Sequence, residues 1–95
     1  MIGKRLRLAR VNANLTQSEL GRRAGMDGES ASTRISQYER GTHAPDFKLV
    51  CKFAVVLDVP EAWFYAVDED LAAMILQYHR YKKNNPGAGI VILPQ

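Results

Sequence analysis

The chain has 95 residues, of which 46% are hydrophobic, so it can form one small domain with a modest core. Its formal net charge is +3, and its single cysteine, Cys51, excludes an internal disulfide. Because disulfide-free chains are typical of a reducing compartment, we expect a cytoplasmic protein. No segment approaches the roughly 20 apolar residues that a membrane-spanning helix needs, so we expect no membrane partner.

The basic residues are unevenly distributed along the chain. Seven of the 13 lie within the first 34 positions: Lys4, Arg5, Arg7, Arg10, Arg22, Arg23 and Arg34. A locally positive N-terminal half favours a polyanionic partner such as nucleic acid, although a solvated basic surface would give the same pattern.

We predict a first helix over Ile2–Asn12, because apolar residues recur there at steps of four and three. This stripe consists of Ile2, Leu6, Ala9 and Ala13. Leu8 falls outside the stripe, and we expect it to be exposed.

A second helix begins after Thr16, which is followed three positions later by Glu19. This spacing predicts a capping box, in which each side chain bonds the backbone N–H of the other residue. Gly21 would let another helix approach closely, and Gly25 is expected to end the helix because it accepts a positive φ.

The third helix is predicted to cover about 31–40 and to end at Gly41. Two starts are compatible with the sequence. Either the preceding turn is long and Ser30 caps the helix, or Asp27 caps a helix that is one turn longer. We favour the long turn, because Gly28 is a poor residue for the first turn of a helix.

This third helix has two unlike sides at 100° per residue. Its apolar side consists of Ala31, Ile35 and Tyr38, and its opposite side of Thr33, Ser36, Gln37 and Arg40, with Ser32 and Arg34 on the flanks. Serine and threonine are weak helix formers, so helix propensity does not explain their use on the outer side, and a functional role is indicated. Two short helices around a glycine turn, the second with a free polar side, are typical of a helix-turn-helix that enters the major groove of DNA.

Ser32, Thr33, Ser36 and Gln37 are therefore the predicted base-reading residues. A glutamine can bind adenine N6 and N7 together, hydroxyl groups suit donors or acceptors, and a threonine methyl can touch a thymine methyl. Six arginines are candidates for phosphate contacts, although not all of them can face the same duplex: Arg5, Arg7, Arg22, Arg23, Arg34 and Arg40.

Three further helices are predicted over Asp46–Leu57, Glu61–Tyr65 and Asp68–Lys83. The expected core stripe of the first is Phe47, Val50, Cys51 and Ala54, and the apolar face of the last is Leu71, Met74, Ile75 and Tyr78. After a break at Asn84–Gly87, the run Ile90–Leu93 is β-prone.

The motifs resemble the phage Cro/CI-type helix-turn-helix family, also called lambda-repressor-like or XRE, over residues 2–65. The resemblance is carried by Ile2-Gly3, Arg5-Leu6-Arg7, Arg10, Leu15-Thr16-Gln17, Glu19-Leu20, Ala24-Gly25-Met26, Ile35-Ser36-Gln37-Tyr38-Glu39-Arg40-Gly41, Pro45, Ala54, Leu57 and Val59. The chain departs from the usual family pattern by an insertion at Asp27-Gly28-Glu29-Ser30.

This resemblance implies an all-α fold, namely a five-helix domain whose third helix reads bases. It implies that Gln17 touches phosphate or supports the third helix, and that Arg10 pairs with Glu39. It also implies that Arg40 or Thr42 contacts phosphate just beyond the third helix.

We expect residues 1–66 to form the helix-turn-helix domain, and 67–95, with a sixth helix and the β-prone tail, to extend it for dimerisation. Helix 61–65 carries three consecutive aromatic residues, which so short a helix can hardly bury within one protomer. The predicted dimer residues are Trp63, Tyr65, Ile75, Tyr78, Ile90 and Ile92. The alternative is that the last helix folds back and covers the aromatic residues.

Together these features predict a transcriptional regulator, a repressor, that binds double-stranded DNA as a homodimer on a pseudo-palindromic operator. The alternative is an antitoxin-like module that binds a second protein, with DNA binding secondary. Cys51 is expected to be a buried structural thiol, and His43 and His79 are distant from it in sequence. We therefore expect no catalytic site, no metal site and no cofactor.

Overall fold

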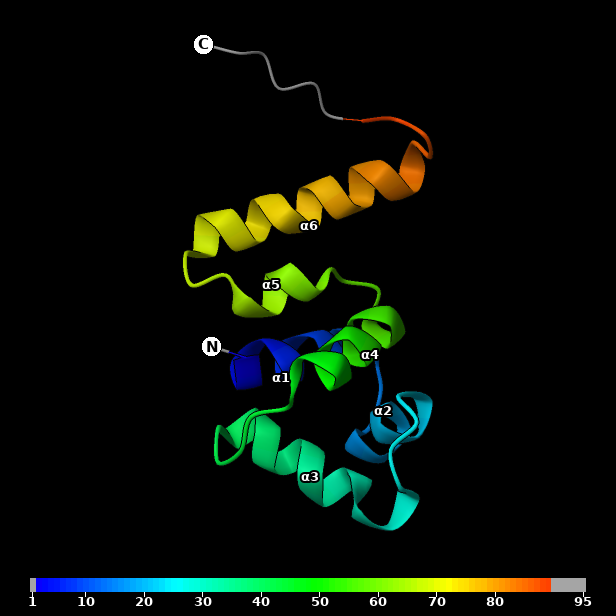
Figure 1. The fold of residues 1–95 in the computed structure, drawn as a ribbon, viewed down its shortest axis with the longest axis vertical. Coiled ribbons are helices and arrows are strands. Elements are labelled where there is room, and N and C mark those ends of the chain that lie inside the picture. Colours follow the sequence, from blue (N-terminus) through cyan, green and yellow to red (C-terminus); the bar gives the residue numbers. More distant parts are fainter. Residues whose placement is uncertain (1, 90–95) are drawn as a thin grey trace.

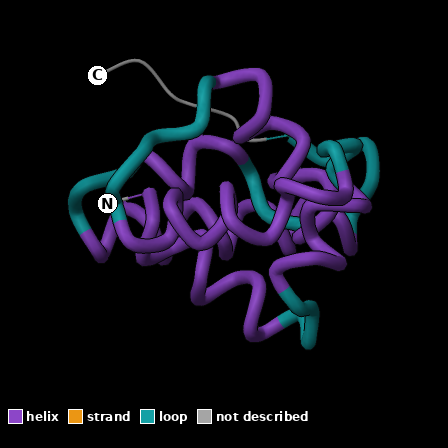
Figure 2. Tube along the Cα trace, turned by 90° about the horizontal axis from the view of Figure 1, so that it is seen from below, coloured by secondary structure: helices purple, strands orange, loops and turns teal. Residues whose placement is uncertain are grey.

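The computed structural model describes residues 2–89 as helices joined by short loops (Figures 1 and 2). The helices are α1 (Ile2–Asn12), α2 (Gln17–Arg23), α3 (Gly28–Arg40), α4 (Phe47–Leu57), α5 (Glu61–Tyr65) and α6 (Glu69–Asn84). The described part of the chain contains no strand, and the predicted all-α fold is confirmed. The β-prone run Ile90–Leu93 lies outside the described residues.

Helices α3 and α6 lie at opposite ends of the molecule, with the other helices between them (Figure 1). The core forms where the apolar faces of α1 to α5 meet. Its largest fully buried side chains are Leu6, Leu20, Ile35, Val50, Phe53 and Phe64. Since α6 packs principally on α5, it covers one end of this core and leaves the α3 end untouched.

The predicted capping box at the start of α2 is present. The Thr16 hydroxyl accepts from the Glu19 backbone N–H at 3.0 Å, and the Glu19 carboxylate accepts from the Thr16 N–H at 3.0 Å. Hydrogen bonds to its carboxyl group, first from the Thr16 backbone N–H and then from the Thr16 side chain, lower the pKa of Glu19. Asp46 and Asp68, predicted as first helical residues, instead cap α4 and α6 from the preceding position, where their side chains accept backbone N–H bonds.

Two glycines allow helices to pack closely on α3. A Cβ on Gly21 would lie 2.5 Å from the Cβ of Ala31, so the predicted close approach at Gly21 is confirmed. A Cβ on Gly3 would lie 2.4 Å from the carbonyl oxygen of Tyr38 and 2.7 Å from that of Glu39. Helix α3 is therefore fixed from behind by both α1 and α2.

The favoured start of α3 is wrong. The helix begins at Gly28, one turn earlier than Ser30 would allow, and Asp27 occupies the N-cap position without a side-chain cap bond. Extending an existing helix adds about one hydrogen bond per residue. That gain outweighs the roughly 1 kcal/mol that one glycine costs in a helix.

The predicted core stripe of α4 is partly wrong. Phe47 is 61% exposed and Cys51 is only half-buried, whereas Phe53 and Leu57 are buried with Val50 and Ala54. The buried positions 50, 53, 54 and 57 follow helical spacing, so the core-facing side is rotated from the predicted one. The Phe47 ring packs instead beside that of Tyr65, with centroids 6.1 Å apart.

The first-helix stripe is correct for Leu6 and Ala9, which are buried, and Leu8 is exposed as expected. Ile2 is half-buried against the core. Ala13 is exposed, because it lies in the turn that follows α1.

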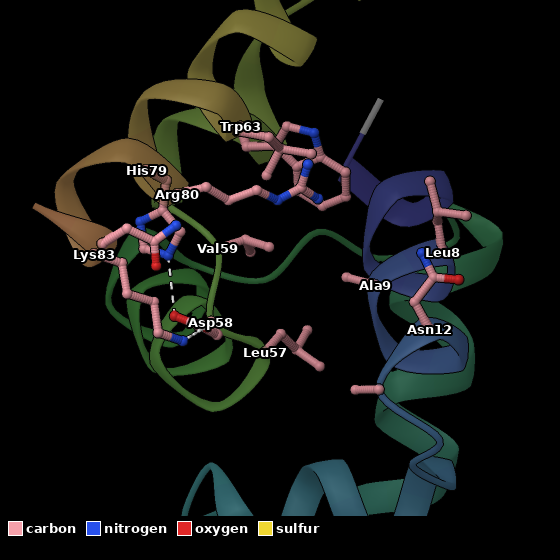
Figure 3. A pocket seen from close by; sticks show the side chains of 13 residues that line it. Leu8, Ala9, Asn12, Leu57, Asp58, Val59, Trp63, His79, Arg80 and Lys83 are labelled. Carbon is pink, nitrogen blue, oxygen red and sulfur yellow. Dashed lines mark hydrogen bonds and ion pairs between the residues drawn. The ribbon is translucent and has the colours of Figure 1, made fainter.

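Polar contacts join α6 to the rest of the molecule at both of its ends. The buried Arg5 guanidinium donates to the carbonyl of Trp63 and, at 3.3 Å, to Glu69. Near the other end, Asp58 bonds His79 at 3.0 Å and also Lys83 (Figure 3). No helix within residues 2–89 is long and apolar enough to cross a membrane.

Candidate nucleic-acid interface

The predicted base-reading residues share one accessible side of α3. Thr33 is exposed, and Ser32, Ser36 and Gln37 are half-exposed. The opposite side of the helix is buried through Ala31, Ile35 and Tyr38. The helix therefore lies against the core by its apolar side and leaves its hydroxyl and amide groups on the accessible side. It forms one end of the molecule (Figure 1).

An ion pair holds the C-terminal end of α3 against α1. Arg10 Nε lies 2.6 Å from Glu39 Oε2, and Arg10 Nη2 lies 3.1 Å from Glu39 Oε1. The two side chains are only 13% and 4% exposed. Arg10 also donates to the Leu15 carbonyl at 2.9 Å, and the hydrogen bond with Glu39 raises the pKa of Arg10. The structure thus contains the Arg10–Glu39 pair that the family resemblance implied.

Gln17 extends this contact to the outer side of α3. Its Nε2 donates to Glu39 at 3.2 Å, and its Oε1 accepts from the Ser32 hydroxyl at 3.4 Å. Of the two roles that the resemblance left open for Gln17, this geometry matches support of α3. The Ser32 oxygen keeps its lone pairs and can still accept a hydrogen bond.

Three predicted phosphate-contact residues are exposed on α2, on α3 and just after α3. Arg22 is exposed on α2, Arg40 is exposed in the last turn of α3, and Thr42 is exposed just after it. Arg40 Nε donates to the Ser36 carbonyl at 3.2 Å, which leaves its remaining N–H groups available. Within residues 2–89, neither Arg22 nor Arg40 takes part in an ion pair.

Two other predicted arginines lie in different places, Arg34 on a flank of α3 and Arg5 in the interior. Arg34 Nη2 donates to the Tyr38 hydroxyl at 2.9 Å, and its guanidinium lies 5.9 Å from the centre of that ring. It therefore lies on the flank that faces Asp46 and Lys48 at the start of α4. The expectation that Arg5 contacts phosphate is wrong, because Arg5 is 5% exposed and its charge is used against Trp63 and Glu69.

The longer α3 brings an acidic residue to the same side. Glu29 is exposed and lies one helical turn before Thr33, at a spacing of four residues. The favoured long turn would have put Glu29 outside the helix, whereas the observed helix places it in line with Thr33. A carboxylate here repels phosphate and can accept only from a base donor such as cytosine N4.

The predicted dimer residues fall into different environments. Tyr65 and Tyr78 are exposed, Ile75 is half-buried, and Ile90 and Ile92 lie outside the described residues. The expectation for Trp63 is wrong, because it is 5% exposed and packs edge-on against Phe64 inside the protomer. Exposed apolar residues that the prediction missed include Val67 and Tyr81.

Comparison with known proteins agrees with this architecture. A helix-turn-helix family model matches residues 6–64. The crystal structure of the transcriptional regulator BswR is similar, with a TM-score of 0.77 and 41% sequence identity, covering 88% of this chain and 87% of that one. A search of curated proteins gave no match. The chain therefore belongs to the XRE, or lambda-repressor-like, helix-turn-helix family of DNA-binding proteins.

Proposed function

We propose that the protein is a sequence-specific transcriptional regulator that represses by occupying a promoter as a homodimer on a pseudo-palindromic operator. The observation that carries this proposal is the accessible polar side of α3, supported from behind by the Arg10–Glu39 pair and Gln17. A helix held this rigidly can present side chains to base edges at defined positions.

In this proposal Ser32, Thr33, Ser36 and Gln37 read bases in the major groove. Gln37 is the strongest specificity element, because its amide can bind both N6 and N7 of one adenine. Thr33 contributes a hydroxyl and a methyl group, and the methyl suits a thymine. Arg10 and Glu39 act through the placement of α3 and touch no base.

Backbone contacts would come from the residues around this side. Arg22 and Arg40 donate to phosphate oxygens, and Thr42 supplies a neutral donor just after α3. Gln17 can add a backbone contact only through the amide N–H that it does not use on Glu39. Arg34 uses only one of its N–H groups on the Tyr38 hydroxyl, so its other N–H groups can donate to a phosphate on the flank of α3. Such contacts set the register on the duplex and make the affinity depend on salt.

Selection of binding sites from random duplexes tests the proposal. We expect an inverted repeat whose half-sites are about one helical turn, roughly 34 Å, apart. The Gln37→Ala variant should select a repeat with one relaxed position in each half-site, and Gln77→Ala, on α6, should select the wild-type repeat. Failure of the wild-type protein to enrich any sequence would contradict the assignment of α3.

A second candidate function rests on α6. Leu71, Met74 and Tyr78 are exposed, so an antitoxin-like module could use them to bind a second protein. Co-purification with the product of a neighbouring gene would support this function if the bound protein also blocks DNA binding.

A further inference from the structure

Helix α6 carries a second apolar stripe that does not face its own core. Leu71, Met74, Tyr78 and Tyr81 are 51%, 65%, 44% and 47% exposed. We call these four residues the α6 seam. They lie at one end of the molecule, whereas α3 lies at the other (Figure 1).

The seam is distinct from the side of α6 that packs inward. The inward side consists of Ala72, which is 2% exposed, and of Ile75 and Leu76, which pack against the core. The inward anchors Glu69 and Lys83 belong to the same side, as their ion pairs show. The apolar residues of the seam are therefore not needed to close the protomer.

The spacing of the seam is that of a coiled coil. Its residues follow one another at steps of three, four and three, which is the a/d pattern of a heptad repeat. Two helices with such stripes pack side by side, and each seam residue inserts between residues of the facing helix. A scattered set of exposed apolar residues would not keep this period over the length of a helix.

We propose that the α6 seam is the dimer interface, and that it packs antiparallel against the seam of a second copy of this chain. Alternation of a and d positions sets Leu71 opposite the partner's Tyr81 and Met74 opposite the partner's Tyr78. The same contacts recur on the other side of the two-fold axis.

Charge complementarity sets the antiparallel direction. Glu69 and Lys83 are already paired within the protomer, so the charges left for a partner are Asp70 in the first turn of α6 and Lys82 in its last turn. Antiparallel packing brings the acidic end of one copy beside the basic end of the other, whereas parallel packing would bring like charges together. Asp68, the N-cap, lies two heptads before Lys82 and so shares the same flank of the seam.

This arrangement rests on the homodimer of the proposed function, and it specifies how the two protomers are placed relative to each other. A two-fold axis that relates antiparallel helices runs perpendicular to the plane of the pair, so both protomer bodies lie on the same side of that plane. Because α3 lies at the opposite end of each protomer from α6, both α3 helices stay away from the interface (Figure 1). The reading surface stays free in the dimer.

The first experiment measures the mass of the particle in solution by sedimentation equilibrium. We expect the wild-type protein to have the mass of two chains and Met74→Glu to have the mass of one. Ala73→Glu is the matched control, since it adds the same charge one residue away, off the seam, and should remain a dimer. Helical circular dichroism checks that both variants fold. A folded, dimeric Met74→Glu protein would overturn the proposal.

The second experiment tests the direction of packing. In a Cys51→Ala background, Leu71→Cys and Tyr81→Cys proteins are oxidised separately and as an equal mixture. Antiparallel packing predicts a disulfide dimer in the mixture and none in either protein alone, because like positions lie far apart along the pair. Disulfides in each separate protein would indicate parallel packing and overturn the inference.

Failure of this inference and failure of the proposed function give different results. If the seam is wrong but the function is right, Met74→Glu stays dimeric and still protects a full operator. If the seam is right but the function is wrong, the mixed disulfide forms while the wild-type protein selects no DNA site. A wild-type monomer that pairs through the seam only with a different protein overturns the inference.

Discussion

The two ends of the molecule present opposite kinds of surface. At the α3 end, small polar side chains face outward from a helix that is fixed by close packing at Gly3 and Gly21 and by the Arg10–Glu39 pair. At the α6 end, large apolar side chains face outward from a helix that packs principally on α5. A rigid polar surface suits recognition of hydrogen-bonding groups, whereas an exposed apolar stripe suits association with another apolar stripe.

This contrast separates two properties that a dimeric DNA-binding protein must combine. Changes at the α3 end should alter DNA affinity and leave the oligomeric state unchanged. Changes at the α6 seam should alter the oligomeric state and leave the affinity for a single half-site unchanged. The variants below test how far the two ends are independent.

The largest effect is expected at the support of α3. Glu39→Ala leaves the nearly buried Arg10 guanidinium without its carboxylate, and should lower the free energy of unfolding by about 3 kcal/mol. Urea denaturation measures the loss, and Glu61→Ala, at an exposed position on α5, is the control. The double variant Arg10→Met/Glu39→Leu should regain at least half of the loss, because it removes both charges. An equally unstable double variant would show that packing rather than charge pairing fixes α3.

A smaller effect, confined to specific DNA, is expected at the reading surface. Gln37→Ala should cost about 1–3 kcal/mol of binding free energy on the selected operator and almost nothing on random duplexes. Fluorescence anisotropy on both duplexes measures the difference. Gln77→Ala removes the same side chain from α6 and should bind like the wild-type protein. An equal loss on both duplexes would remove Gln37 from the base-reading residues.

Arg40 tests the backbone contacts. Arg40→Ala should weaken binding to all sequences alike and reduce the slope of log K against log salt concentration by about one. The matched control, Arg80→Ala, removes an exposed arginine from α6 and should leave the slope unchanged. If the two variants behave alike, the overall positive charge rather than a contact at α3 accounts for the salt dependence.

The smallest effect concerns the attachment of α6. Hydrogen bonds from Lys83 and His79 lower the pKa of Asp58 in the folded protein. The stabilisation is therefore present above the unfolded pKa of about 3.9 and is lost as the pH falls through the lower folded value. Because the Asp58 side chain is 56% exposed, we expect no more than about 0.5 kcal/mol.

Asp58→Asn should reduce this acid-dependent loss of stability while keeping the backbone, since asparagine tolerates the left-handed conformation found there (φ 56°). Thermal melts between pH 3 and pH 7 measure the difference. Identical pH profiles for the two proteins would show that the Asp58 contacts do not hold α6.

Much of the fold could be predicted from local signals. The Thr16–Glu19 capping box, the end of α3 at Gly41 and the α5 bounds depend on chemistry within a few residues, and the structure has all three. The start of α3 could not be predicted in this way. An extended helix and a long turn around Gly28 differ by a small free energy, and the sum over the whole segment decides between them.

The fate of the charged residues depended on tertiary contacts. Arg5 and Arg7 are neighbours on α1, yet the first is buried against Trp63 and the second is exposed. The sequence of the first helix does not indicate that Arg5 will contact Trp63, which lies 58 positions away. Tertiary packing also decides the exposure of Phe47, because it depends on how α4 meets α5. The apolar stripe of α4 alone does not indicate it.

The close contact at Gly3 has a consequence for how variants of this protein should be interpreted. A single methyl group added there would meet two carbonyl oxygens in the last turns of α3, so it would tilt that helix. An operator-binding defect caused by such a change would look like the loss of a DNA contact, although the altered atom never approaches a nucleotide. The orientation of α3 is thus set partly by the absence of a side chain at Gly3, on the side of α3 that packs on α1.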